Sequence, residues 1–359
     1  MPLPEQHFPL WRGLASMGGG SYPSRMARIR DFLVPSRIHV DQGTGSIRET
    51  PSIRRFSLAL AGLMLGGVSS VSLSVLPALA AGGEHSAEKP ASHDIVQVAQ
   101  SASSMTSTAR PDQAQILKIA SGMAAHRIHY DLTLDGTPTG DVIGARGGMD
   151  YEVIDACDGW ATRQRLEMTI SNRDGQDIQM VSDYTTWESK DGTRMRFHMR
   201  QTTDTAVSQE TAGEASMDGF GHSGTIRYDL PRPMTKPIQA GTFFPMMHTA
   251  ALLAAAEDGI KFSALPLFDG TSADGVQDTF VVALDWKKSV PVKIDLLKDM
   301  PSAKVLVSFF DTDKARIEPA YQAGMRYWLN GVADDLTMNF GDFKLKGGIA
   351  SFKSLPHKC

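Results

Sequence analysis

The feature of this sequence that most restricts its fold is a long series of short segments in which apolar and polar residues alternate. Successive side chains of a β-strand point to opposite faces, so strict alternation predicts a strand with one buried face. The apolar positions of these segments are Ile128, Tyr130, Leu132 and Leu134; Met149, Tyr151 and Val153; Leu166, Met168 and Ile170; Met195, Phe197 and Met199; Phe280, Val282, Leu284 and Trp286; Met325, Tyr327 and Leu329; Leu336, Met338 and Phe340; Phe343 and Leu345.

Short polar segments that contain Gly, Asn or Asp separate many of these runs. They read "SNRDGQD" (171–177), "SKDG" (189–192), "LNGVADD" (329–335) and "GDF" (341–343). Such residues favour tight turns, and short turns join antiparallel neighbours. No helices recur between the strands, so the pattern does not predict a parallel α/β sheet. The sequence therefore predicts a mainly β protein with antiparallel strands.

Two segments are predicted to be helical. In "PDQAQILKIASGMAA", Asp112 is an N-cap candidate ahead of a short helix that precedes the first strand. In "FFPMMHTAALLAAAEDG", Pro245 suits a first helical turn, residues 246–257 form the helix and Gly259 ends it. Apolar residues surround most of this second helix, which predicts that it is buried. We therefore expect a large curled antiparallel sheet, a β-spiral or open barrel, wrapped on one buried helix.

The N-terminal part of the chain carries the pattern of an export signal. Arg54 and Arg55 precede an uncharged, largely apolar stretch that ends in Ala78-Leu79-Ala80, the order of a signal peptide with an A-x-A cleavage site. A transmembrane anchor is the alternative for this stretch. We predict an upstream extension at 1–50, a signal peptide at 51–80, an Ala- and Ser-rich flexible leader at 81–111 and a single domain at 112–359. Export would place the protein outside the cytoplasm, in an oxidising compartment.

Composition narrows the classes of partner. The chain is 42% hydrophobic and 21% charged, as in ordinary globular proteins. Residues 81–359 hold 28 Lys and Arg against 36 Asp and Glu, a net charge of −8. That acidic balance argues against nucleic acid as the main partner.

The chain has two cysteines, Cys157 and Cys359. After export to an oxidising compartment, two cysteines tend to pair and to stay paired. A nucleophilic cysteine or a metal ligand is the alternative, although neither residue lies in a Cys-x-x-Cys or Cys/His spacing.

Several segments together resemble a known family. "AHRIHYDLTL", "YEVIDACDGW", "FFPMMHTAALLAAAEDG", "LPLFDG" and "YWLNGVADDLTMNFGDFKL", followed by the last cysteine, are similar in kind and order to the EipB family of periplasmic cell-envelope integrity proteins. The resemblance covers roughly residues 112–359. It implies a single-domain β-spiral like that of the lipoprotein carriers LolA and LolB, a Cys157–Cys359 disulfide and a role in envelope integrity. The family pattern F-P-T-x-H has Met246 in place of Thr here, which weakens any idea of a hydroxyl acting with His248.

No enzyme motif is found in a suitable context, so we expect no catalytic residues, no cofactor and no metal. His248, in the first turn of the buried helix, is the main candidate for a site, and the helix dipole would favour its neutral form. The alternative is a structural histidine hydrogen-bonded to a loop. Phe243, Phe244 and Pro245, which lead into this helix, are further binding candidates.

A cationic strand face is another candidate for binding. Arg194, Arg196, His198 and Arg200 alternate with apolar residues, so they share one face of a predicted strand. The face would suit an anion such as a lipid headgroup, or it is an ordinary solvated face.

Three functions are therefore compared. The preferred one is a non-catalytic periplasmic protein that maintains the envelope by binding a lipid or lipoprotein, or a periplasmic protein such as one with tetratricopeptide repeats. The second is a hydrolase of envelope polymers with His248 as base. The third is a purely structural module without a cleft. A groove lined by Met and Phe side chains would favour the first, whereas a solid interior would exclude its lipid version.

Overall fold

The structure is a computed structural model that describes residues 110–137, 140–311 and 317–356. The predicted upstream extension and signal peptide lie outside the described residues, as do Cys359 and nearly all of the predicted leader. Within the described ranges, no helix is long and apolar enough to cross a membrane.

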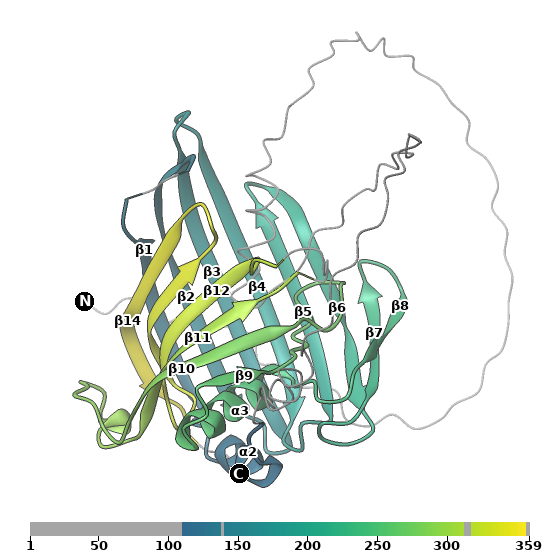
Figure 1. The fold of residues 1–359 in the computed structure, drawn as a ribbon. Coiled ribbons are helices and arrows are strands. Elements are labelled where there is room, and N and C mark those ends of the chain that lie inside the picture. Colours follow the sequence, from purple (N-terminus) through teal and green to yellow (C-terminus); the bar gives the residue numbers. More distant parts are fainter. Residues whose placement is uncertain (1–109, 138–139, 312–316, 357–359) are drawn as a thin grey trace, which may run out of the picture. The chain divides into compact units, whose positions relative to one another are not determined.

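Fourteen strands form one antiparallel sheet (Figure 1). They are β1 (His126–Leu134), β2 (Val142–Asp155), β3 (Gly159–Asn172), β4 (Asp177–Ser189), β5 (Arg194–Thr203), β6 (Ala206–Met217), β7 (Gly224–Leu230), β8 (Met234–Ile238), β9 (Phe262–Ala264), β10 (Thr279–Lys287), β11 (Ser302–Phe309), β12 (Tyr321–Trp328), β13 (Ala333–Asn339) and β14 (Lys344–Ser354). The predicted antiparallel class is confirmed, and the four predicted turns join β3 to β4, β4 to β5, β12 to β13 and β13 to β14.

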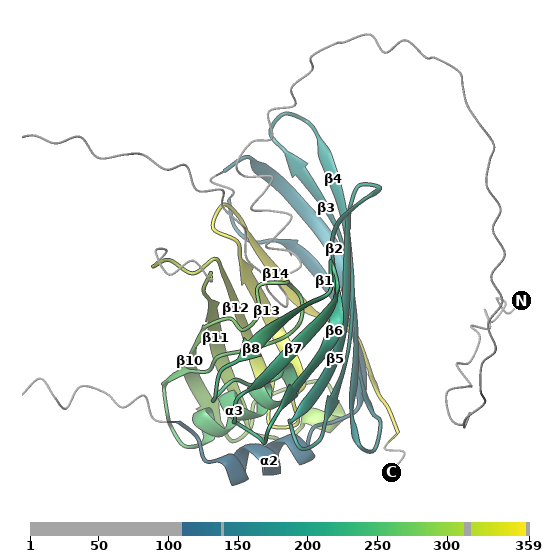
Figure 2. The same cartoon turned by 90° about the vertical axis from the view of Figure 1, so that its right-hand side faces the viewer.

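The sheet consists of two meanders joined along one pair of strands. Strands β1–β8 and β9–β14 each run in sequence order, and β1 pairs with β14. The two edges, β8 and β9, do not pair, so hydrogen bonds do not close the sheet into a barrel. Figure 2 shows the consequence: the sheet curls until β1–β6 stand opposite β10–β13. The expected open, curled sheet is therefore confirmed.

Both predicted helices are present. In α2 (Gln113–Ser121), the Asp112 side chain accepts a hydrogen bond from the backbone N–H of Gln115, the contact expected of an N-cap. Helix α3 (Pro245–Glu257) joins β8 to β9, and eleven of its residues are buried. It ends where Gly259 takes a φ of +72°, which glycine adopts without strain. α3 lies at one end of the curled sheet, and α2 packs on it (Figure 2). A short 3₁₀ helix, η2 (Asp295–Leu297), lies in the β10–β11 connection.

Residues 265–278, the inner loop, pack on the inner faces of β5–β8. Phe268 is fully buried, and its ring meets those of Phe197, Tyr228 and Phe244 edge-on. The backbone carbonyls of the loop are bound by side chains of the sheet. Tyr184 donates to the carbonyl of Asp269 at 2.6 Å. The inner loop thus fills one side of the spiral without forming a strand of its own.

Of the apolar residues predicted for one alternation, Leu284 lies on the outer face, whereas Trp286 packs against the core because a bulge between Ala283 and Asp285 shifts the register. In β10, Val281 faces inward and is 2% exposed, whereas Leu284 is 65% exposed. Phe280 stacks on Phe262 of the edge strand, with ring centroids 6.2 Å apart. The inward positions of β10 include Thr279, a polar residue that the pattern alone would place outside. The hydroxyl of Thr279 is tied by hydrogen bonds, so its burial carries no unpaired group.

Candidate functional site

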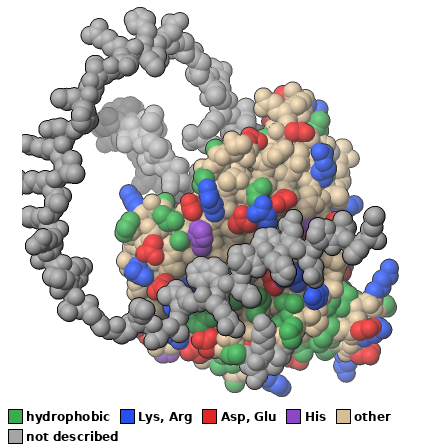
Figure 3. Space-filling model, turned by 180° about the vertical axis from the view of Figure 1, so that it is seen from behind, with side chains coloured by type: hydrophobic (Ala, Val, Ile, Leu, Met, Phe, Trp, Pro, Cys, Tyr) green, Lys and Arg blue, Asp and Glu red, His purple; other side chains and the backbone are tan. Residues whose placement is uncertain are grey.

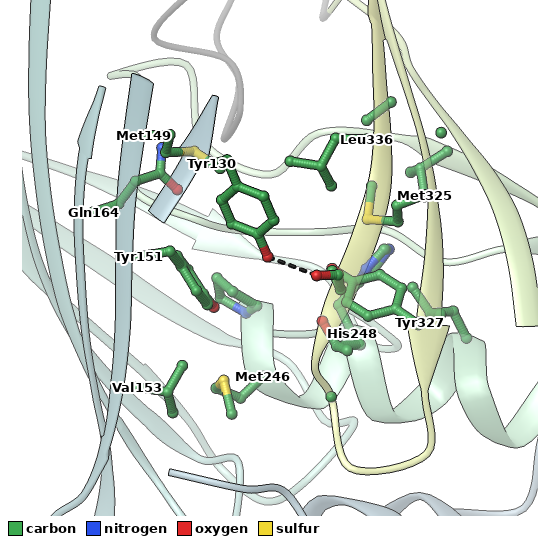
Figure 4. A pocket seen from close by; sticks show the side chains of 18 of the residues that line it. Tyr130, Met149, Tyr151, Val153, Gln164, Met246, His248, Met325, Tyr327 and Leu336 are labelled. Carbon is green, nitrogen blue, oxygen red and sulfur yellow. Dashed lines mark hydrogen bonds between the residues drawn. The ribbon is translucent and has the colours of Figure 1, made fainter. Parts of the chain in front are cut away.

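A cavity of about 110 Å³ lies inside the curled sheet beside α3. We call it the lumen cavity (Figure 4). Its walls come from β1–β3, from β11–β13 and from α3, which are far apart in the sequence. Some of the lining strand residues, among them Tyr130, Met149 and Leu336, are positions that the alternation identified. The interior is therefore not filled solid by side chains.

The cavity wall is mainly apolar and rich in methionine. Its methionines are Met123, Met149, Met246, Met325 and Met338. Methionine is unbranched and polarisable, so it adapts to apolar partners of varied shape. Phe309 and Leu336 add further apolar surface. A wall of this kind suits hydrocarbon.

The polar groups of the wall are uncharged at neutral pH. No Lys, Arg, Asp or Glu is among the residues that line the cavity. The hydroxyl of Tyr130 donates to the carbonyl of Ala333 at 2.7 Å, as Figure 4 shows. Burial raises the pKa of Tyr130, Tyr151 and Tyr327, so these phenols stay protonated.

His248 lies in the first turn of α3 and lines the cavity, but its ring is engaged. Nε2 is 3.0 Å from the hydroxyl of Thr279, which in turn donates to the carbonyl of Leu265. The hydroxyl proton is used in that second bond, so Nε2 donates to the Thr279 oxygen. Burial lowers the pKa of His248 to about 4. The predicted neutral ring is confirmed, with burial as its main cause, and its contact joins α3 to β10.

A second buried group, Glu188, was not identified from the sequence. It is 1% exposed and accepts the backbone N–H of Met246 at 3.0 Å with each carboxyl oxygen. α3 has no side-chain cap from its own N-cap residue, Phe244, so a residue of β4 supplies the cap. Burial raises the pKa of Glu188 to about 8, against the opposing effect of the N–H groups.

The other predicted residues of the helix segment divide into two groups. Pro245 lines the lumen cavity. Phe243 and Phe244 do not; they are 3% and 0% exposed and belong to the core. Phe243 packs against Phe220 and Phe244 against Phe268. Neither ring lines the lumen cavity, and a role for them in binding stays a prediction.

The predicted cationic row lies on the outer face of β5, away from the cavity. Arg194, Arg196 and Arg200 are exposed, while the alternate residues of β5 are buried. Acidic residues stand opposite in the neighbouring strands: Glu214 faces Arg196, and Arg200 lies between Asp183 and Glu210. Figure 3 shows basic and acidic side chains interspersed on this side of the molecule. The acidic neighbours therefore largely neutralise the positive charge of this row. Binding of an anion by the row stays a prediction.

Cys157 lies at the turn between β2 and β3, with a φ of +70°. Its backbone N–H donates to a carboxyl oxygen of Asp155. Because Cys359 lies outside the described residues, the disulfide stays a prediction. Among the residues that the structure describes, no three His, Cys, Asp or Glu side chains are grouped as a metal site requires.

Several polar residues of the cavity also escaped the sequence analysis, although the alternation contained a signal. Gln164 is in phase with the apolar Leu166, Met168 and Ile170, and His126 is in phase with Ile128. A polar residue in phase with buried ones faces the interior. Both side chains line the lumen cavity.

Comparison with known proteins agrees with this architecture. A crystal structure of a beta-barrel-like protein of a domain of unknown function from Brucella abortus is 28% identical, with a TM-score of 0.59 over 65% of this chain and 99% of that one. The cell envelope integrity protein EipB of Brucella abortus (strain 2308) is 32% identical over 235 residues, which are 63% of this chain and 82% of the relative. The family model described as EipB-like matches residues 117–356. By sequence and by fold, this chain belongs to the EipB-like family.

Proposed function

We propose that this chain is a non-catalytic periplasmic protein that helps to maintain the cell envelope by holding an apolar part of an amphiphilic molecule in the lumen cavity. The observation that carries the proposal is the cavity itself: about 110 Å³ of space, with an apolar, methionine-rich wall, inside the curled sheet beside α3. The printed name of the relative from Brucella abortus supports the envelope role.

The size of the cavity defines what part of a ligand it takes. At about 110 Å³ it is smaller than the roughly 150 Å³ cavity that accepts benzene in an engineered protein. It therefore suits a short segment of an acyl chain, with the remainder of a lipid or lipoprotein outside. Five methionines of the wall could adjust to chains of different shape.

The hydrolase alternative has weaker support. A general base works best with a pKa near the working pH, whereas burial lowers the pKa of His248 to about 4. Its Nε2 is occupied by Thr279, whose hydroxyl already donates to Leu265. These contacts favour a structural role for His248, in which it joins α3 to β10.

The proposal is tested by extracting lipids from protein purified in native form from the periplasm. Ala323 lies on the cavity wall, so the variant Ala323→Phe fills the space with a ring. Wild-type protein should carry amphiphiles detectable by mass spectrometry, and Ala323→Phe should carry at least about tenfold less. Ala206→Phe, at an exposed position of β6, is the matched control and should retain them. Wild-type protein free of amphiphile, and unable to take it up from vesicles, would contradict the proposal.

A protein partner is the second candidate, favoured by exposed apolar residues next to the sheet edge. Phe262 of β9 is 55% exposed, and Leu284 of β10 is 65% exposed. A periplasmic protein with tetratricopeptide repeats is the partner class suggested by the family resemblance. If it binds here, Leu284→Lys should abolish its co-purification, whereas Ala323→Phe should not. Co-purification that withstands Leu284→Lys would exclude this surface.

A further inference from the structure

The polar groups of the lumen cavity restrict which chemical class of ligand can enter it, and this inference rests on the proposed binding function. Four side chains of the wall have a buried polar atom without a hydrogen-bond partner among the described residues: His126, Gln164, Tyr321 and Asn330. Each of the four residues is at most 5% exposed. A buried polar atom without a partner is costly, so such atoms mark places where a ligand or water is bound.

The four residues come from separate parts of the fold. His126 opens β1, Gln164 lies in β3, Tyr321 opens β12 and Asn330 is in the β12–β13 turn. They converge only because the sheet curls, and all four line one cavity. Their convergence on an otherwise apolar space is the usual design of a small-molecule site.

The neighbouring hydrogen bonds define the role of two of these atoms. Nδ1 of His126 lies 2.7 Å from the carbonyl of Ala124, to which it donates, so Nε2 of the neutral ring is an acceptor. Burial lowers the pKa of His126, which keeps the ring neutral. Oδ1 of Asn330 accepts the N–H of Val332 at 3.3 Å, so its free Nδ2 is a donor.

The other two atoms complete the pattern. The unpartnered atom of Gln164 is Oε1, an acceptor, and the hydroxyl of Tyr321 can donate or accept. The cavity thus offers acceptors and donors together, and no charged side chain lines it. A carboxylate or phosphate would face two acceptors with no cation to balance it. An ammonium group would enter without a carboxylate partner, at a large cost in hydration.

We infer that the lumen cavity selects the uncharged, hydroxyl- or amide-bearing part of an amphiphile and rejects charged groups. A hydroxyl or amide donates and accepts at once, which matches the mixture of free atoms on the wall. Charged headgroups of the same molecule would remain outside the cavity.

The test uses four ligands that share one hydrocarbon chain: hexan-1-ol, hexanamide, hexanoate and hexylammonium. Binding to the purified protein at pH 7 is measured by NMR titration. The alcohol and the amide should bind at least about tenfold more tightly than the two ions, because the ions lose hydration without gaining a partner. Equal affinity for all four would overturn the inference and leave the proposed function intact. Absence of binding by every member would overturn both.

Variants separate hydrogen bonding from simple filling of space. Gln164→Met keeps the length of the side chain but removes the acceptor, so affinity for hexan-1-ol should fall about fivefold. Gln179→Met, the same change at an exposed position of β4, should have no effect. Undiminished affinity in a folded Gln164→Met protein would show that the polar wall does not recognise the ligand, and the inference would be wrong.

Discussion

Two buried ionisable residues, His248 and Glu188, hold the first turn of α3 in place. His248 joins the helix to β10 through Thr279, and Glu188 caps the helix from β4. Burial moves both pKa values in the direction that favours the neutral form, to about 4 for His248 and about 8 for Glu188. The stability of the domain should therefore decline at both acid and alkaline pH.

The first prediction concerns acid. The folded-state pKa of His248, about 4, lies below the ordinary histidine pKa of 6.5, so its stabilising effect is complete above pH 6.5 and disappears as pH falls through about 4. The loss amounts to roughly 3 kcal/mol of unfolding free energy. In His248→Gln, whose amide nitrogen can reach Thr279, this part of the decline should be absent. Urea unfolding at pH 7 and pH 4.5 measures the unfolding free energy of both proteins. An equal decline in the wild type and in His248→Gln would contradict the prediction.

The second prediction concerns alkali. Because the pKa of Glu188 is raised from 4.5 to about 8, its contribution is complete below pH 4.5 and disappears as pH rises through about 8. Between pH 5 and 8 the unfolding free energy of the wild type should fall by roughly 3 kcal/mol. In Glu188→Gln this part of the fall should be absent. Asp269, whose pKa burial raises to about 7, contributes in the same direction. Because Asp269 is present in both proteins, the test compares how steeply the unfolding free energy falls with pH in the wild type and in Glu188→Gln. Equal slopes would refute the prediction.

At the scale of elements, the inner loop is held by side chains from strands that are far away in the sequence. Tyr184 binds the carbonyl of Asp269, Thr211 that of Gly270 and Tyr228 that of Ser272. These bonds satisfy backbone groups that a buried loop would otherwise leave unpaired. They explain how a segment without regular structure can form part of the core.

Gly270 is the position where the inner loop should be least tolerant of change. It has a φ of +75°, and an added Cβ would lie 2.3 Å from the Phe197 ring. Gly270→Ala should therefore cost roughly 2–5 kcal/mol, from backbone strain and overpacking together. Gly175→Ala, with a φ of +84° and no atom within 4 Å, is the matched control. Gly175→Ala should lower the unfolding free energy only by the backbone strain, roughly 1–2 kcal/mol. Equal losses for the two variants in thermal unfolding would show that the inner loop relaxes around the added methyl group.

For the whole molecule, the decisive feature is that the first and last strands pair. β1 lies between β2 and β14, so the two meanders form one sheet. In this register Ser354 pairs with His126, which pairs with Val153. The last described residues therefore lie at the same end of the sheet as the β2–β3 turn that carries Cys157.

This arrangement supports the prediction of a Cys157–Cys359 disulfide. Such a bond would close a loop of roughly 200 residues and stabilise the protein by up to about 5 kcal/mol in the chain-entropy model. Cys157→Ser, Cys359→Ser and the double variant should be destabilised equally, since either change removes the same bond. Thiol titration of the unreduced, denatured wild type should find no free thiol, and two free thiols would refute the pairing.

Much of the architecture could be predicted from local patterns. Alternation identified the inward rows of β1, β3 and β5, and the all-round apolar run identified α3, because these residues are buried in apolar clusters. Strand β4 escaped because its inward row contains Ser182, Tyr184, Thr186 and Glu188. Tyr184 binds the inner loop and Glu188 the start of α3, so hydrogen bonds replace apolar contacts at these two positions.

The sequence by itself determined the antiparallel class and the buried helix, because these depend on periodicity. It also predicted the neutral state of His248 from the helix dipole, whereas burial is the main cause in the structure. Only the tertiary structure decided that Glu188 caps α3, that Phe243 and Phe244 belong to the core, and that four polar residues meet in one cavity. Each of these depends on which distant strands face each other across the curl. Local sequence carries no information about that pairing, since it follows from the closure of β1 on β14.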